Sequence, residues 1–182
     1  MADRAKNCQC KPREGAIGIA ARHRLAVEAL ALSGDENVLE IGCGHGVATR
    51  LVLERLTTGR ITALDRSGKM TASLKSGLPD AGDRLRAIAQ AFEDVDWADQ
   101  KFDAIFAVNV DLNLRLGPRW APLMKSLLRA DGRIVLAFEA PPGSDKGGRF
   151  ADASRQYLAA QGFGVKTMHD ESGVTLVFAR FH

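Results

Sequence analysis

The run Val38–Thr49 (VLEIGCGHGVAT) constrains the fold of this chain more than any other stretch. It begins with the apolar character of a buried strand, continues with glycines at every second position, and ends with apolar side chains at helical spacing. Glycine has no Cβ and tolerates positive φ, so a ligand can approach the backbone of such a loop closely. The loop amides and the following helix N-terminus can receive polar or anionic groups. The pattern predicts a strand, a ligand-binding loop and a helix; the alternative is a turn that binds nothing.

The composition is typical of one globular domain: 182 residues, 46% hydrophobic and 26% charged. Residues 1–14 are polar and charged, so we expect a mobile arm there and a single domain over residues 15–182. The arm does not have the character of a signal peptide, and no stretch approaches the roughly 20 apolar residues of a membrane span. Cys8, Cys10 and Cys43 suggest no disulfide framework. The lack of such a framework fits a reducing compartment, so we expect a cytoplasmic protein. Cys8 and Cys10 lack further ligands nearby, so we expect no metal site.

Strand-like and helix-like segments alternate along the chain. Helices are predicted over residues 15–32, 47–53, 67–75, 117–128 and 150–161. Strands are predicted over residues 38–41, 60–65, 85–91, 102–110, 133–139, 164–168 and 174–181. Residues 130–132 are predicted as a turn, residues 140–148 as a flexible loop, and residues 170–173 as the turn of a hairpin. The alternation predicts a parallel α/β sheet with right-handed crossovers, and the hairpin predicts that the last strand runs antiparallel.

The glycine spacing fits neither of two common nucleotide-binding patterns. The dinucleotide fingerprint has glycines at its first, third and sixth positions. Gly42 and Gly44 fill the first two, but Val47 stands at the sixth and the third glycine, Gly46, comes one position early. The phosphate-binding P-loop also fails, because no Gly-Lys-Ser/Thr follows.

The arrangement Glu40-x-Gly42-x-Gly44-x-Gly46, with Asp65 at the end of the second strand, resembles the class I S-adenosylmethionine-dependent methyltransferases. The resemblance extends from residue 37 to the C-terminus and is most specific in VLEIGCGHG and ITALDRS. It implies an α/β fold with a Rossmann-like, doubly wound, seven-stranded sheet in the order 3-2-1-4-5-7-6, strand 7 being antiparallel. The predicted terminal hairpin agrees with that order.

The resemblance also implies a binding site for S-adenosylmethionine. The glycine loop would line the methionine part and the sugar, and Glu40 would help to fix the loop or the amino group of the cofactor nearby. Asp65 would accept both ribose hydroxyls; the alternative for Asp65 is a simple turn residue or helix cap. The implied cofactor-binding residues are Glu40, Gly42, Cys43, Gly44, His45, Gly46, Asp65, Arg66, Met70, Gln90, Ala91, Phe92 and Asn109.

The adenine contact departs from the family pattern. An acid followed by a small residue is usual after strand 3, whereas this chain has Gln90-Ala91 followed by Phe92. Gln90 can accept the adenine amino group through its amide oxygen. A shifted alignment would select Glu93 and Asp94 instead.

The expected reaction is in-line methyl transfer, in which the protein aligns the acceptor with the methyl group and excludes water. A general base is needed only for an acceptor that must lose a proton, and Asp111 and His45 are weak candidates for it. Two alternatives remain: a non-catalytic cofactor-binding or scaffold protein of the same fold, and an NAD-dependent oxidoreductase.

The acceptor is predicted to be a small molecule. We expect only three segments to cover the site: the helix over residues 15–32, the loop over residues 111–117 and the segment 141–148. Aromatic residues make up 6% of the chain and the net charge is +3, which argues against stacking platforms for nucleic acid. Nucleic-acid and protein substrates and the oligomeric state stay open, and no membrane partner is expected.

Overall fold

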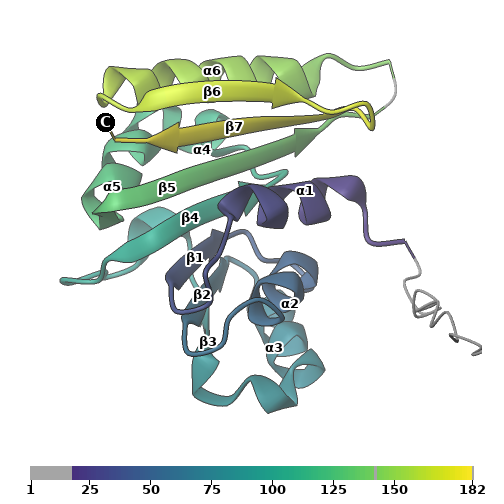
Figure 1. Cartoon of the computed structure of the whole chain (residues 1–182), viewed down its shortest axis with the longest axis vertical. Coiled ribbons are helices and arrows are strands. Elements are labelled where there is room, and N and C mark those ends of the chain that lie inside the picture. The colour runs from purple at the N-terminus through teal and green to yellow at the C-terminus, as the bar shows by residue number, and fades with distance from the viewer. Residues whose placement is uncertain (1–17, 142, 182) are drawn as a thin grey trace, which may run out of the picture.

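Seven strands form one sheet in the order β3-β2-β1-β4-β5-β7-β6 (Figure 1). The computed structural model describes residues 18–141 and 143–181, so the arm expected over residues 1–14, with Cys8 and Cys10, lies outside the described residues. β7 pairs antiparallel with β5 and β6, and the other neighbouring strands are parallel. The expected strand order is therefore confirmed. The strands are β1 Asn37–Ile41, β2 Arg60–Asp65, β3 Leu85–Ala89, β4 Phe102–Val108, β5 Leu128–Glu139, β6 Gly164–His169 and β7 Val174–Arg180.

Helices cover both faces of the sheet because successive strand residues point to opposite sides. Leu39 and Ile105 pack with Trp120 on one face, whereas Val38 packs with Val27 on the other. The first face carries α4 Leu112–Leu116, α5 Trp120–Leu127 and α6 Lys146–Ala160; the second carries α1 Ala21–Leu30, α2 Val47–Leu53 and α3 Gly68–Gly77. Short 3₁₀ helices are η1 Pro79–Arg84, η2 Phe92–Asp94 and η3 Gly117–Arg119. Within residues 18–141 and 143–181, no helix is long and apolar enough to cross a membrane.

Two local predictions around β4 and β5 were wrong. Residues 112–116, expected to be part of a loop, form α4, whose N-cap Asp111 accepts a hydrogen bond from the Leu114 amide at 2.9 Å. Leu112, Leu114 and Leu116 recur at every second position, which is not the spacing of a helix, so the sequence pattern did not indicate this helical turn. Residues 130–132, expected as a turn, lie within β5 as an irregularity: Phe102 pairs with Leu128, but Ala104 pairs with Arg133. Residues 130–132 therefore form an irregularity between two parts of β5 that both pair with β4.

The segment after β5 is shorter than expected. α6 begins at Lys146, so the loop predicted over residues 140–148 ends before that residue. Gly147 is buried, and a Cβ at that position would lie 3.4 Å from the Ala140 Cβ. A methyl group there would be in tight contact with Ala140, so helix and loop are closely packed at this point.

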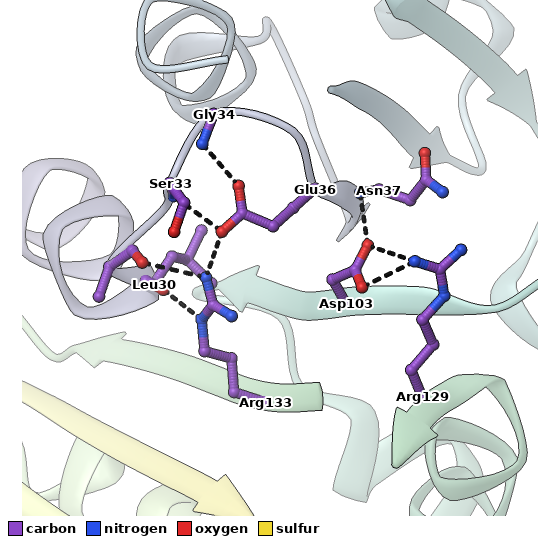
Figure 2. A network of polar contacts seen from close by, with 9 residues as sticks. Leu30, Ser33, Gly34, Glu36, Asn37, Asp103, Arg129 and Arg133 are labelled. Carbon is purple, nitrogen blue, oxygen red and sulfur yellow. Dashed lines mark hydrogen bonds and ion pairs between the residues drawn. The ribbon is translucent and has the colours of Figure 1, made fainter. Parts of the chain in front are cut away.

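A buried ion pair fixes α1 to β1 and β5 (Figure 2). The Arg133 guanidinium donates to the Glu36 carboxylate at 3.0 Å and to the carbonyls of Leu30 and Ala31. Glu36 also accepts from the amides of Ser33 and Gly34 at 2.8 and 2.9 Å. Burial raises the pKa of Glu36, but these two amides and Arg133 outweigh it, so the net pKa lies below its ordinary value.

Candidate functional site

A cavity of about 600 Å³ opens at the carboxyl ends of β1, β2 and β4. β1 lies between β2 and β4, so the sheet reverses its order here, and open α/β sheets bind ligands at such a point. The cavity is lined by Ile41, Gly42, Leu64, Asp65, Arg66, Gln90, Phe92, Val108, Asn109, Val110, Asp111, Leu114 and Arg115. The sequence-predicted residues outside this lining are Glu40, Cys43, Gly44, His45, Gly46, Met70 and Ala91.

The three glycines of the loop all have positive φ, but the space around a Cβ built at each one differs. Their φ values are 77° at Gly42, 51° at Gly44 and 80° at Gly46. A Cβ at Gly42 would lie 2.4 Å from a Val110 methyl, and one at Gly46 would lie 2.2 Å from a Leu74 methyl. A Cβ at Gly44 would meet nothing within 4 Å. A side chain at the first or third position would therefore require Val110 or Leu74 to move, whereas the backbone of Gly44 faces open space that a ligand can enter.

The end of β2 holds the glycine loop in place. The Leu64 carbonyl accepts from the amides of Gly42 and Cys43 at 2.7 and 2.9 Å. The two carboxylate oxygens of Asp65 accept from the amides of Gly44 and Ser67, each at 2.9 Å. Asp65 thus organises two turns, and each of its oxygens keeps a lone pair for a further donor.

Glu40 is buried and does not line the cavity. It is 3% exposed, and the Thr49 hydroxyl donates to its carboxyl group. Burial raises the pKa of Glu40 to about 8, and the neighbouring charge of Asp65 adds to the shift. Glu40 is therefore mostly protonated at neutral pH. Its hydrogen bond with Thr49 joins β1 to the first turn of α2.

Two further loop residues differ in exposure. Cys43 is buried, and burial raises the pKa of its thiol to about 12, so it is not a reactive thiolate. His45 is exposed and does not line the cavity, which weakens it as a catalytic candidate.

The segment after β3 forms another wall of the cavity. Gln90 and Phe92 line it and Ala91 does not. Phe92 is anchored edge-on against Trp97, with ring centroids 5.9 Å apart. Glu93 forms an ion pair with Arg115 of α4, which joins two sides of the cavity.

Leu114 and Arg115 line the cavity. They belong to the segment 111–117 that was expected to cover the site, but neither was named as a site residue. Leu114 is 83% exposed, an unusual position for a leucine unless a ligand or partner covers it. The signal that could have found both residues is Asp111, whose N-cap role places a helical turn after β4.

Asn109 connects the ends of β4 and β5. It has a φ of 54°, its amide donates to the Ala137 carbonyl at 2.8 Å, and its side-chain oxygen accepts from the Glu139 amide at 2.7 Å. Its side-chain oxygen therefore holds the ends of β4 and β5 together in the cavity wall.

A second cavity of about 200 Å³ adjoins the first, with Asn109 and Asp111 in both linings. Its other lining residues are Phe138, Glu139, Ala140, Pro141, Lys146, Gly147 and Phe150. Glu139 forms an ion pair with Arg22, so α1 reaches the rim of this cavity. The shared residues place Asp111, the other catalytic candidate, at the junction between the two cavities.

A doubly wound sheet with a glycine loop after β1 and an acid at the end of β2 defines a Rossmann-like protein. Residues 38–132 match the methyltransferase domain family. The chain belongs to this family, the class I S-adenosylmethionine-dependent methyltransferases. Trans-aconitate 2-methyltransferase of Escherichia coli is 37% identical over 128 residues, which cover 67% of this chain and 47% of that protein. The chain thus spans about half the length of this relative.

Two solved structures have the same fold. A S-adenosylmethionine-dependent methyltransferase from Aquifex aeolicus matches with a TM-score of 0.73 at 13% identity, covering 86% of this chain and 88% of that chain. The Burkholderia thailandensis 1,6-didemethyltoxoflavin-N1-methyltransferase matches with a TM-score of 0.68 at 21% identity, covering 88% and 78%. The latter was solved with 1,6-didemethyltoxoflavin and S-adenosylhomocysteine bound.

Proposed function

We propose that this protein transfers the methyl group of S-adenosylmethionine to a small acceptor that carries a carboxylate. The observation that carries the proposal is the pair of adjoining cavities, about 600 and 200 Å³ in volume, that share Asn109 and Asp111. A donor in the larger cavity and an acceptor in the smaller one would meet at these two residues. Family membership supports the choice of donor.

The residues in and next to the larger cavity suit this cofactor. The open space at Gly44 can receive the methionine part, and the remaining lone pairs of Asp65 can accept two hydroxyl groups of a ribose. Gln90 and Phe92 provide an amide and an aromatic wall for the adenine. When bound, S-adenosylmethionine supplies a methyl group activated by a sulfonium, with S-adenosylhomocysteine as the leaving group.

The smaller cavity suits a small acid. Its volume of about 200 Å³ accommodates a small molecule, and Phe138 and Phe150 give it an apolar wall. Lys146 lies in the lining and forms no ion pair with any residue that the structure describes, so its ammonium can bind a carboxylate. Trans-aconitate, the acid in the name of the E. coli relative, has this chemistry.

A carboxylate acceptor also removes the need for a general base. Carboxylates are ionised at neutral pH and can attack a methyl group without losing a proton. The protein then has to align and desolvate the acceptor. Asp111, which caps α4, would position this junction without taking a proton.

The test is methyl transfer from radiolabelled S-adenosylmethionine to trans-aconitate, with an aliphatic amine and a phenol as comparison acceptors. We expect labelled product from the acid alone. Lys146→Met should raise the KM for the acid about tenfold or more, as expected for loss of a charged hydrogen bond. Lys166→Met on β6 is the matched control and should change nothing. Labelling of only the amine or phenol would contradict the carboxylate assignment, and binding of NAD instead of S-adenosylhomocysteine would contradict the methyltransferase activity.

A further inference from the structure

One face of the sheet has no crossover helix at β3. The connection from β3 to β4 contains only η2 and irregular chain, without an α-helix. Ile61 packs with the core beneath α1 and α2, so its neighbours Arg60 and Thr62 point to the opposite face. Thr62 pairs with Arg86 on β3, which therefore points the same way. Two arginines consequently project from the uncovered face near the amino ends of β2 and β3.

A cavity of about 430 Å³ opens beside this face, at the amino ends of β1, β2, β3 and β4. Its lining residues are Asn37, Val38, Arg60, Ile61, Thr62, Asp83, Arg86, Gln100, Lys101, Phe102 and Arg129. The lining includes four cationic side chains and one acidic side chain, Asp83. The volume falls in the range of pockets that bind small molecules.

Only one of these cations is neutralised by an ion pair among the described residues. Arg129 pairs with Asp103 at 2.8 and 3.0 Å, and Asp103 also accepts from the Asn37 amide at 2.8 Å (Figure 2). Arg60, Arg86 and Lys101 form no ion pair with any residue in 18–141 or 143–181. The cavity therefore keeps an excess of positive charge.

We propose that this cavity binds a small ligand that carries two or more phosphate groups. Guanidinium groups bind phosphate oxygens through paired, charge-assisted hydrogen bonds. The cations that line this cavity come from β2, β3, β5 and the residue just before β4. A ligand with several negative charges can contact more than one of them. Thr62 adds a hydroxyl group to the floor.

This site is separate from the proposed methyl-transfer site. Arg60 begins β2 and Asp65 ends it, so the two sites lie at opposite ends of one strand. At about 3.3 Å per residue, the separation is roughly 17 Å. Both sites can be occupied at once, and the polyphosphate site does not depend on the proposed function.

Titration calorimetry with sodium tripolyphosphate tests the proposal. We expect binding of one tripolyphosphate per chain, weaker binding as salt is raised, and unchanged affinity when S-adenosylhomocysteine is present. Arg60→Gln and Arg86→Gln should each lower the affinity about tenfold or more. Arg155→Gln on α6 removes the same charge at an exposed site and should leave the affinity unchanged.

Three results would overturn the proposal. These are no binding to the wild-type protein, an equal loss of affinity in the Arg155→Gln control, and competition with S-adenosylhomocysteine. Circular dichroism of each variant ensures that a loss of affinity is read only from folded protein. Because both arginines are exposed, we expect the substitutions to preserve the fold.

Discussion

The carboxylate of Asp65 accepts a hydrogen bond from the amide of Gly44 at 2.9 Å, so the last residue of β2 fixes the loop that follows β1. These residues lie on neighbouring parallel strands and meet at the carboxyl edge of the sheet. The same carboxylate faces the larger cavity. One side chain therefore both fixes the loop and lines the cavity.

Substitution of Asp65 by alanine should lower the affinity for S-adenosylhomocysteine by on the order of 2–4 kcal/mol, because the two charge-assisted hydrogen bonds proposed to the ribose would be lost. Calorimetry measures this change, and thermal unfolding measures the accompanying loss of loop stability. Ser67→Ala is the control, since it removes the cap of α3 and leaves the carboxylate in place. Equal loss of affinity in both variants would contradict the ribose contact.

Gly44→Ala should mainly lower the affinity for the cofactor, whereas Gly46→Ala should mainly lower the stability of the fold. Alanine at Gly46 places a methyl group against Leu74 and should destabilise the fold by about 1–3 kcal/mol, in addition to backbone strain. Alanine at Gly44 should cost only the strain of positive φ, about 1–2 kcal/mol, but its methyl group would occupy the ligand space. Urea unfolding and cofactor titration separate the effects. Full retention of affinity in Gly44→Ala would show that the ligand does not approach this backbone.

Sequence patterns predicted the parts of the fold that depend on local periodicity. The run from Val38 and the strand Arg60–Asp65 have nearly continuous apolar character because both faces of these strands are covered. The glycine spacing and Asp65 then indicated the family and hence the strand order. Ser67 was recognised as the N-cap of α3 because serine before a helix is a local signal.

Features that depend on distant partners could not be predicted in this way. The helical turn that carries Arg115 has a local signal in Asp111, but the ion pair of Arg115 with Glu93, a residue far away in the sequence, has none. Asn109 has a polar side chain suited to a ligand, but its oxygen is used by the Glu139 amide of the neighbouring strand. Local sequence defines which groups can form hydrogen bonds, and tertiary packing selects the partner.

Glu40 should make stability fall as the pH rises. Its pKa is about 8 in the folded protein and 4.5 ordinarily, so between these values the folded chain binds a proton that the unfolded chain has lost. The free energy of unfolding then decreases by about 1.4 kcal/mol per pH unit in this window and is constant on either side. Glu40→Gln has no such titration. Urea unfolding from pH 4 to 9 should therefore show a difference between wild type and variant that changes across this window; a constant difference would contradict the raised pKa.

Arg133→Met should destabilise the protein by about 3–5 kcal/mol, because it leaves the carboxylate of Glu36 buried without its cation. Arg129→Met is the matched control: its partner is Asp103, but half of the Arg129 side chain is exposed, so the loss should stay within about 1 kcal/mol. Urea unfolding at neutral pH measures both changes. Adding Glu36→Gln to Arg133→Met should recover part of the loss, since the unpaired buried charge is removed. Equal destabilisation in the two arginine variants would contradict the buried pair as the element that ties α1 to β1 and β5.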